Sequence, residues 1–434
     1  MTDAAPAPGG TLGVRQAAFI GVGAMVGAGI FSLLGAAGEV AGSAVWISFL
    51  LAGVIAMLQG YSFAKFGARY PSAGGLLEYV IRGFGDGHAT GVMAWLIYAV
   101  NAIITAMVAV SFGSYASEAI AGGSEVWLKV FAVGVVAAMT LLNVVGSEAV
   151  ARVQTLVVVI VIGILSVFAV VTLANAQAHL LAPSGYPPFK DIVSGVALTF
   201  FAFLGFGVIT FTAKDLRDPR RDLPRAMYLA LGIATVIYLA VSLGVFGTLT
   251  VQQVIDSGGT ALAVAAEPTL GRAGYWMMSI TALFATAGAT NAGLYPATGL
   301  CDQMAAVGQF PPAMARRVGD RLSVGLLGTA VVAMVLAALA DLSSIASIGS
   351  AVALMVFTLI TASHLRVRSE TGANPVVLVV ALVATGTVLV TFAVTTLVHE
   401  PATLWLLAGI VGLSALGDVW WKRKRPAAAA DPSP

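Results

Sequence analysis

Runs of about 20 apolar residues recur along the whole chain, and this repetition limits the fold more than any other feature. A run of roughly 20 apolar residues is long enough to cross a bilayer as a helix. Hydrophobic residues make up 59% of the 434 positions and charged residues only 10%. About twelve such runs predict an all-α integral membrane protein. We place the spans at residues 15–37, 44–68, 89–113, 126–145, 153–175, 191–213, 226–249, 274–305, 323–340, 343–365, 374–397 and 402–420.

Positively charged residues predict the orientation of these spans. In a topology of about twelve spans, every lysine and arginine except Lys129, Lys190 and Arg272 falls on one side of the membrane. Cytoplasmic loops carry the excess of these residues in membrane proteins. We therefore expect a multi-pass protein of the cytoplasmic membrane with both termini inside. A disordered arm is expected over residues 1–14, and a basic, then disordered tail over residues 421–434.

Several classes of function are excluded by the composition. Cys301 is the only cysteine, so the chain has no intrachain disulfide and no thiolate metal cluster. The sequence contains no hydrolase elbow, phosphate loop or catalytic carboxylate pair, and a net charge of +2 is too small to indicate a nucleic-acid partner. We expect no enzymatic activity, no cofactor and no bound metal. The histidines lie at predicted span ends or in loops, which argues against a histidine relay in the membrane; they are His88, His179, His364 and His399.

Glycines interrupt two spans that occupy corresponding places in the two halves of the chain. Gly23 and Gly27 form a GxxxG pair, and an isolated pair of this kind most often only brings two membrane helices close together. In FFAFLGFGVITF (200–211), however, Gly205 and Gly207 flank Phe206 much as Gly27 and Gly29 flank an alanine in the first span. Paired, glycine-interrupted spans of this kind indicate a transporter site near the middle of the bilayer.

A helix that breaks inside hydrocarbon has to line a cavity or hold a ligand. Each amide or carbonyl left without a partner there costs on the order of several kcal/mol. Free amides at the start of a half-helix suit an anion, and free carbonyls at the end of one suit a cation. An amino acid carries both charges at a short separation, so the two breaks favour a small zwitterionic substrate.

Four segments resemble the best-marked motifs of the amino acid, polyamine and organocation transporter family. They are GVGAMVGAGIF (21–31), ARYPSAGGLLEYVIRGFG (68–85), FFAFLGFGVITFTAKDLRDPRRDLPRAM (200–227) and TNAGLYPATGLCDQMAAVGQFP (290–311). The resemblance implies a five-plus-five inverted repeat in which spans one and six are discontinuous, with two further spans after it. The first repeat would cover residues 15–175, the second residues 191–365, and the extra spans residues 374–420. It also implies alternating access around a site between spans one, three, six, eight and ten.

The resemblance assigns roles to particular residues. The backbone amides of Gly27, Ala28 and Gly29 would hold the substrate carboxylate. The carbonyls of Phe203, Leu204 and Phe206 would receive the ammonium group, while Gly205 and Gly207 let that stretch unwind. Phe201 aligns with an aromatic residue that closes over the ligand from outside, although a lipid-facing phenylalanine is an equally good interpretation of the sequence alone. Further pocket residues would be Tyr98 and Asn101 on span three and Ser343, Ser344 and Ser347 on span ten.

Departures from the family pattern bear on coupling. Proton-coupled relatives often have a lysine in the middle of span five, where this chain has Val161. Sodium could instead bind between span-one carbonyls and the hydroxyls of Thr286 and Thr290, which share a helix face at a spacing of four. Those threonines could equally serve helix packing. Amino acid exchange, or simple equilibration without any ion, is the third alternative.

Substrate class follows from the expected lining of the pocket. Relatives often have a carboxylate directly after the span-six break, where this chain has Gly207. A neutral, partly aromatic lining favours a neutral amino acid over a cationic amino acid or a polyamine. A channel would display a ring of polar or charged residues along several spans, and none is evident in the sequence. The expected partners are therefore a small-molecule substrate, a sodium ion or a proton if transport is coupled, and lipid; the sequence does not specify the oligomeric state.

Overall fold

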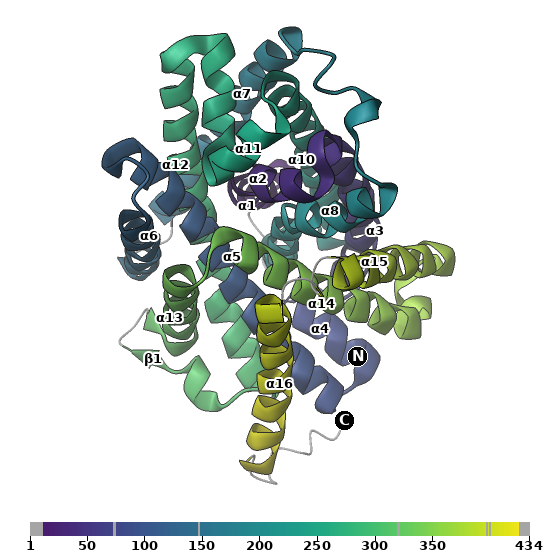
Figure 1. Cartoon of the computed structure of the whole chain (residues 1–434). Helices are drawn as coiled ribbons and strands as arrows, with labels where there is room; N and C mark the ends of the chain where they lie inside the picture. Colours follow the sequence, from purple (N-terminus) through teal and green to yellow (C-terminus); the bar gives the residue numbers. More distant parts are fainter. Residues whose placement is uncertain are drawn as a thin grey trace.

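Helices dominate the computed structural model, which describes residues 12–72, 75–145, 148–318, 322–395, 398 and 401–424, with the backbone alone for residues 28, 144, 145 and 148–154 (Figure 1). The α-helices are α1 (Val14–Ala28), α2 (Ile30–Ala41), α3 (Val45–Arg69), α4 (Leu76–Phe84), α5 (His88–Ala121), α6 (Glu125–Val145), α7 (Glu148–Ala174), α8 (Phe189–Phe201), α9 (Val208–Phe211), α10 (Pro219–Thr248), α11 (Val251–Ser257), α12 (Ala261–Ala306), α13 (Val324–Leu339), α14 (Leu342–Thr371), α15 (Pro375–Thr395) and α16 (Pro401–Lys424). Short 3-10 helices are η1 (Gly42–Ala44), η2 (Pro183–Gly185), η3 (Leu204–Gly207), η4 (Ala213–Asp215), η5 (Gly258–Thr260) and η6 (Pro312–Ala315).

The all-helical membrane class predicted from the sequence is confirmed. Among the described residues, eight helices are long and apolar enough to cross a membrane, and a ninth span is counted if the bent pair Phe189–Phe201 and Leu204–Phe211 is one span. Two further apolar helices, α1 and α13, are shorter. The number of twelve spans and the five-plus-five repeat stay predictions. Below, span one denotes α1 with α2, and span six denotes α8, η3 and α9.

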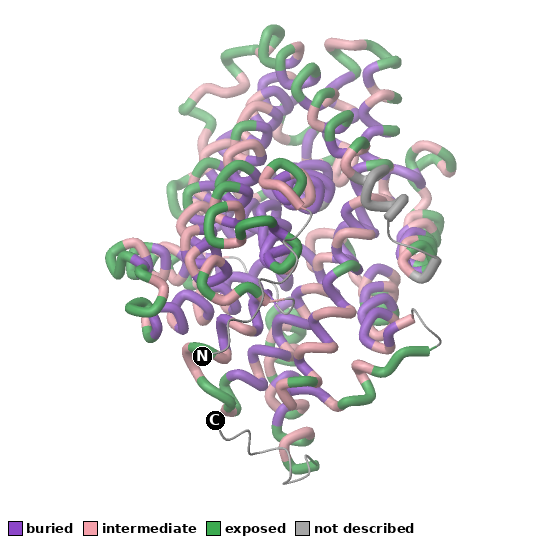
Figure 2. Tube along the Cα trace, turned by 180° about the vertical axis from the view of Figure 1, so that it is seen from behind, coloured by how far each residue is buried: buried purple, intermediate pink, exposed green. Residues whose placement is uncertain are grey.

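Burial is greatest around the two interrupted spans. In the tube view, buried residues fill the centre of the bundle and exposed residues lie toward its outside (Figure 2). Large apolar side chains such as Trp127, Val390 and Trp405 are exposed on α6, α15 and α16. Hydrocarbon is as apolar as these side chains, so an apolar outer surface is expected for helices that face lipid. The interrupted spans one and six therefore lie in the buried centre of the bundle, away from the apolar outer surface.

Three short elements connect the long helices at the two ends of the bundle. The helix α4 begins after Gly75 and ends before Gly85, both with positive φ (51° and 73°), which glycine adopts without steric cost. A two-stranded antiparallel hairpin pairs β1 (Arg317–Val318) with β2 (Leu322–Ser323). Both lie toward the bottom of Figure 1, whereas α11 lies toward the top. Because α4 follows the predicted cytoplasmic loop after span two, the lower end corresponds to the expected cytoplasmic side.

The start of the chain is more ordered than the sequence suggests. The arm predicted over residues 1–14 ends before Leu12, because the Leu12 amide donates to the Asp215 carbonyl (2.9 Å) and the Arg217 amide donates to the Leu12 carbonyl (3.2 Å). This parallel bridge pairs Leu12 with Leu216, which is buried. Backbone pairing therefore ties the beginning of α1 to the loop after span six; residues 1–11 and 425–434 lie outside the described residues.

Candidate functional site

Span one is interrupted at Gly29, within the glycine segment singled out in the sequence. The Gly29 amide donates to the Met25 carbonyl (2.9 Å), which completes the hydrogen-bond ladder of α1. The Gly29 carbonyl then accepts from the amides of Ser32 (3.3 Å) and Leu33 (3.2 Å), so α2 starts a new ladder. With ψ of −68°, Gly29 departs from ideal helical geometry. The predicted break in span one is present.

Span six is interrupted over residues 202–207. Its two arms, residues 189–201 and 204–211, are bent by 43° relative to each other. Between them the amides of Ala202 and Phe203 donate to the carbonyls of Thr199 (3.1 Å) and Phe200 (2.9 Å), an i to i−3 pattern that tightens the chain. The Ala202 carbonyl accepts a hydrogen bond from the buried Tyr238 hydroxyl (3.0 Å). A tyrosine of α10 thus satisfies a carbonyl at the break, a role that the sequence analysis did not foresee.

The two breaks pack directly against each other. A Cβ added to Gly29 would overlap Ala202 and lie 2.9 Å from the Tyr238 hydroxyl. A Cβ on Gly205 would lie 2.5 Å from both the Ala24 carbonyl carbon and the Met25 amide nitrogen of α1. These two glycines therefore serve close backbone approach between spans one and six, which the smallest residue alone allows.

A cavity of about 50 Å3 lies beside the break of span six. Asn101 of α5 is its one polar side chain, and Gly207 opens directly onto it, since a Cβ there would find its nearest neighbour, Leu76 Cδ1, 3.9 Å away. The Asn101 Nδ2 atom is buried and finds no hydrogen-bond partner among the described residues. The cavity is lined by Leu76, Ile97, Val100, Asn101, Ile104, Leu204, Gly207, Val208, Phe211, Pro296, Leu300, Val356 and Phe357. An uncharged, largely apolar pocket with one amide can hold an apolar side chain and orient it.

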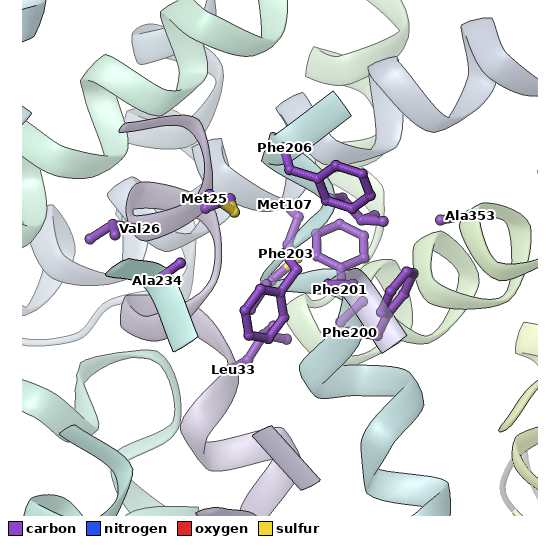
Figure 3. Close-up of a cluster of buried hydrophobic side chains, with 14 of the residues drawn as sticks. Met25, Val26, Leu33, Met107, Phe200, Phe201, Phe203, Phe206, Ala234 and Ala353 are labelled. Carbon is purple, nitrogen blue, oxygen red and sulfur yellow. The ribbon is translucent and has the colours of Figure 1, made fainter. Parts of the chain in front are cut away.

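Four phenylalanines radiate from the span-six break into the surrounding helices (Figure 3). Phe201 is buried between Gly349 of α14 and Ile103 of α5, which rules out the lipid-facing interpretation. Phe203 packs edge to face on Tyr238, with ring centroids 5.0 Å apart. Phe206 packs on Phe357 at 5.5 Å. The side chains of Phe203 and Phe206 are thus structural, while Leu204 and Gly207 between and beside them reach the cavity.

A second, much smaller cavity of about 10 Å3 lies between spans one, five and eight. Its lining is Gly23, Val26, Gly27, Val157, Val158, Val161 and Ala285. No ionisable or hydroxyl side chain is among these seven described residues. The Thr286 hydroxyl donates to the Ala282 carbonyl (2.6 Å), and the Thr290 hydroxyl donates to the Thr286 carbonyl (2.9 Å). These are the back-bonds expected of hydroxyls within membrane helices. A hydroxyl that donates its proton in this way still has oxygen lone pairs, so the sodium site at these threonines stays a prediction.

Several predicted pocket residues lie away from the cavity at span six. Gly27 lines the smaller cavity, and a Cβ on it would overlap the Ala285 carbonyl of α12. The Tyr98 hydroxyl lies against α13, where a Cβ on Gly328 would be 2.7 Å from it, and its ring packs on Phe310. The Ser344 amide and hydroxyl both donate to the Asp341 carboxylate (2.8 Å each), which caps α14. Ser344 and its neighbour Ser343 are thus about 18 Å along the helix from the lining residue Val356. Ser347 is buried on the same helix but is not among the lining residues.

Some functional positions were missed, and the sequence held a signal for part of them. Ile97 and Ile104 line the cavity at spacings of four and three from Asn101, so they occupy the same face of α5. His364 was expected at a span end, yet it is fully buried, with Nδ1 2.8 Å from the Ser62 hydroxyl and its ring 4.1 Å from that of Phe66. No sequence pattern marks His364 as an interior residue, because Ser62 and Phe66 lie on α3 and only its second hydrogen-bond partner, Thr371, is on α14.

The cavity at span six and a wider hollow are lined by neighbouring residues of α12. Pro296 and Leu300 line the cavity, while Gly299 and Gln303, each three residues further along the same helix, line a vestibule of about 580 Å3. The vestibule also contains charged side chains, among them Glu78 and Lys214. An apolar cavity thus lies near a charged vestibule at the end of the bundle that is expected to face the cytoplasm.

Comparison with known proteins settles the family. The family model described as amino acid permease matches residues 12–413. The chain belongs to the amino acid permease family. It is 32% identical over 417 residues to the inner membrane transport protein YbaT of Escherichia coli, covering 95% of this chain and 97% of that protein. The permease also matches the branched-chain amino acid permease BcaP of Bacillus subtilis (26% identity, 56% of each chain). A further relative is the vacuolar cationic amino acid transporter 4 of Arabidopsis thaliana (30% identity, 52% of this chain and 41% of that one).

Membership of this family confirms the resemblance noted in the motifs. The permease is a membrane transporter rather than an enzyme, and its substrate class is that of amino acid permeases. Relatives named for branched-chain and for cationic amino acids both match it. The choice between these substrates has to come from the chemistry of the cavity.

Proposed function

We propose that the permease carries a neutral amino acid with an apolar side chain across the cytoplasmic membrane by alternating access. The observation that carries this proposal is the lining of the cavity beside the span-six break, which consists of apolar side chains and a single amide around a space of about 50 Å3. The cationic amino acid and polyamine alternatives are disfavoured, because an ionised substrate side chain would meet no counter-charge there and burying it would cost several kcal/mol.

Asn101 is the residue we assign to substrate recognition in this cavity. Its Nδ2 atom is a buried donor without a partner among the described residues. A donor in that state costs roughly 1–3 kcal/mol unless a ligand satisfies it. A substrate carboxylate is an acceptor of the right kind, and the backbone around Leu204 and Gly207 completes the site. The earlier assignment of the carboxylate to the amides of Gly27, Ala28 and Gly29 stays a second possibility for a conformation in which the two breaks separate.

Transport without a coupling ion is the mode that the smaller cavity supports. A proton route needs a titrating group, and the seven side chains around that cavity supply none, with Val161 at the place of the lysine of proton-coupled relatives. The Thr286 and Thr290 hydroxyls donate to carbonyls of their own helix, which favours the packing role of these threonines over sodium binding. We therefore propose exchange or equilibration of amino acids, with both termini cytoplasmic.

Uptake into proteoliposomes tests both parts of the proposal. Labelled leucine, isoleucine, valine and phenylalanine are offered with a sodium gradient, a proton gradient or an internal load of unlabelled amino acid, one at a time. Saturable uptake is expected, stimulated by the internal load and unaffected by either ion gradient. Competition by arginine, lysine or putrescine but not by neutral amino acids would refute the substrate class. Non-saturable flux would indicate a channel.

Two threonine variants test the coupling mode separately. Thr286→Val combined with Thr290→Val removes both hydroxyls while keeping side-chain size. If no sodium binds there, the uptake rate of the double variant stays within about twofold of the wild type at every sodium concentration. A sodium-dependent rate that is lost in the double variant would restore the sodium hypothesis.

A further inference from the structure

We infer that Gln303 is a latch residue that controls opening of the path between the substrate cavity and the cytoplasmic vestibule. The inference rests on the proposed function in one respect, because a latch matters only if a substrate leaves by this path. The supporting contacts join α12, on one side of the vestibule, to Ser72 and to Glu78 of α4 on the other side. Nothing in the sequence motifs marks Gln303 for this role.

Gln303 makes both of its hydrogen bonds across the vestibule. Its Oε1 atom accepts from the Ser72 hydroxyl (2.8 Å), and its Nε2 atom donates to Glu78 Oε2 (3.2 Å). Glu78 in turn accepts from Arg82 Nε (2.8 Å), so the carboxylate is held from both sides. The Arg82 guanidinium lies over the Tyr70 ring, 4.5 Å from its centroid. One amide side chain therefore bridges two partners that belong to a different part of the bundle.

The Gln303 bridge to α12 is the weaker of the two attachments of α4; the attachment to α14 is stronger. On its other face, α4 is fastened to α14: the Ser363 hydroxyl donates to the Tyr79 carbonyl (2.6 Å), and Arg366 donates to the Gly83 carbonyl (3.3 Å). Gly83 permits this closeness, since a Cβ there would overlap Ser363. Between α4 and α12, by contrast, the hydrogen bond found among the described residues is the one from Gln303 to Glu78. If the vestibule widens, the Gln303 bonds are the ones that break, because α4 stays with α14.

Leu76, the first residue of α4, lines the cavity, and Ser72 lines the vestibule. Gly75 lies against α9, where a Cβ would lie 2.8 Å from the Thr210 hydroxyl and 2.9 Å from the Phe211 ring. Holding Ser72 and Glu78 against α12 therefore keeps Leu76 in place beside the inner cavity.

The expected consequence is a shift of the closed-to-open equilibrium when the bridge is removed. Loss of two side-chain hydrogen bonds, one of them to a carboxylate, corresponds to about a three- to tenfold change in that equilibrium after solvent replaces them. Gln303→Ala removes both bonds. Gln303→Glu keeps the acceptor for Ser72 but faces Glu78 with a like charge, so it opens the path further. Glu78→Gln added to Gln303→Glu again supplies a donor and an acceptor across the gap.

A thiol-accessibility assay measures, without any substrate, how far the path between the cavity and the vestibule is open. Val208 lines the cavity, and Val208→Cys introduces a reporter, while the native Cys301 is buried and gives the background rate. Inside-out vesicles are treated with a small charged thiol reagent from the cytoplasmic side. The reporter is expected to react about three to ten times faster with Gln303→Ala, faster still with Gln303→Glu, and at close to the starting rate after Glu78→Gln is added.

The matched control is Gln252→Ala on α11, where the amide also donates to a carboxylate, Asp256 Oδ1 (2.8 Å), at the opposite end of the bundle. It is expected to leave the reporter rate unchanged.

In proteoliposomes, Gln303→Ala should change net efflux more than exchange, because exchange does not require return of the empty carrier. Equal reporter rates in wild type, Gln303→Ala and Gln303→Glu would overturn the latch. If the wild type transports no neutral amino acid but the reporter rates change as stated, the proposed function fails and the latch stands. Should Gln303→Ala fail to fold, Ser72→Ala removes one bond of the bridge and is expected to give about half the effect on a logarithmic scale.

Discussion

Gly205 and Gly207 are two residues apart at the span-six break, yet the space around them differs completely. A Cβ on Gly205 would lie 2.5 Å from backbone atoms of α1, whereas a Cβ on Gly207 would enter the cavity with no atom closer than 3.9 Å. We predict that Gly205→Ala destabilises the protein by about 1–3 kcal/mol, as overpacking of a rigid contact does. Gly207→Ala should leave the thermal unfolding midpoint unchanged but raise KM for the larger neutral amino acids. Thermal unfolding and competitive uptake of the two purified variants check this contrast, and equal midpoints would contradict it.

Asn101 is expected to lower the stability of the protein and to strengthen substrate binding. Asn101→Leu replaces a buried, unpartnered donor with an apolar group of similar size. The unfolding midpoint should stay the same or rise, because removing an unsatisfied donor is neutral or stabilising. Substrate affinity should fall about tenfold, which corresponds to one lost hydrogen bond to a charged group. Stabilisation of each variant by added leucine, measured by thermal shift, separates the two effects; a lower midpoint with unchanged affinity would refute the assignment.

At the scale of elements, α14 depends on a cap that responds to pH. Partial burial by itself would raise the pKa of Asp341, but the hydrogen bonds from the Ser344 amide and hydroxyl outweigh it and hold the pKa below its usual value of 3.8. A carboxyl whose pKa is lowered on folding stabilises the protein above the usual value and loses that contribution as the pH falls through the folded-state value. Asp341→Ala should therefore cost about 1 kcal/mol at neutral pH. The difference in unfolding midpoint between wild type and variant should shrink below pH 3.8. Asp256→Ala, which removes a carboxylate that does not cap a helix, is the control; a difference independent of pH would contradict the cap.

At the scale of the whole molecule, the bridge between Leu12 and the loop after span six links the arms of both broken spans that are expected to face the cytoplasm. We expect these arms to move together during transport, because the Leu12 and Arg217 amides hold them by backbone hydrogen bonds. Leu12→Pro removes the donor to Asp215 and should slow exchange by about two- to tenfold without changing substrate affinity. Arg217→Ala removes only an exposed side chain, keeps the amide, and should behave as the wild type. Equal exchange rates in the two variants would show that the arms move independently.

Prediction from sequence succeeded for features that depend only on residues close together in the chain. The breaks fell where the glycines of spans one and six predict them, at Gly29 and over residues 202–207. Asn101, predicted to line the pocket, is among the residues that line the cavity, as expected of an isolated amide on an apolar helix; its role in substrate binding stays a prediction. Val161, aligned by motif alone, lies beside Gly27 in the smaller cavity as the alignment implies.

Other predicted residues lie away from the cavity, because the direction of a side chain depends on which neighbour it meets. Tyr98 is one turn from Asn101 on α5, but its direction is set by α13 and Phe310. Ser344 binds the local cap of α14 instead of the pocket. The ordering of Leu12 could not be foreseen either, because its partners come from residues about 200 positions later in the chain.

The sequence by itself determined that this chain lies in a membrane, which spans are interrupted and to which family it belongs, because apolar length, glycine spacing and motif order are local properties. Only the tertiary structure decided that the glycines at 29 and 205 serve contact between the two breaks, that the cavity lies on the side of Gly207 and Asn101, and that Gln303 bridges α12 to α4. Those features arise where helices from distant parts of the sequence meet, and close packing there, not composition, fixes which polar atoms stay available to a substrate.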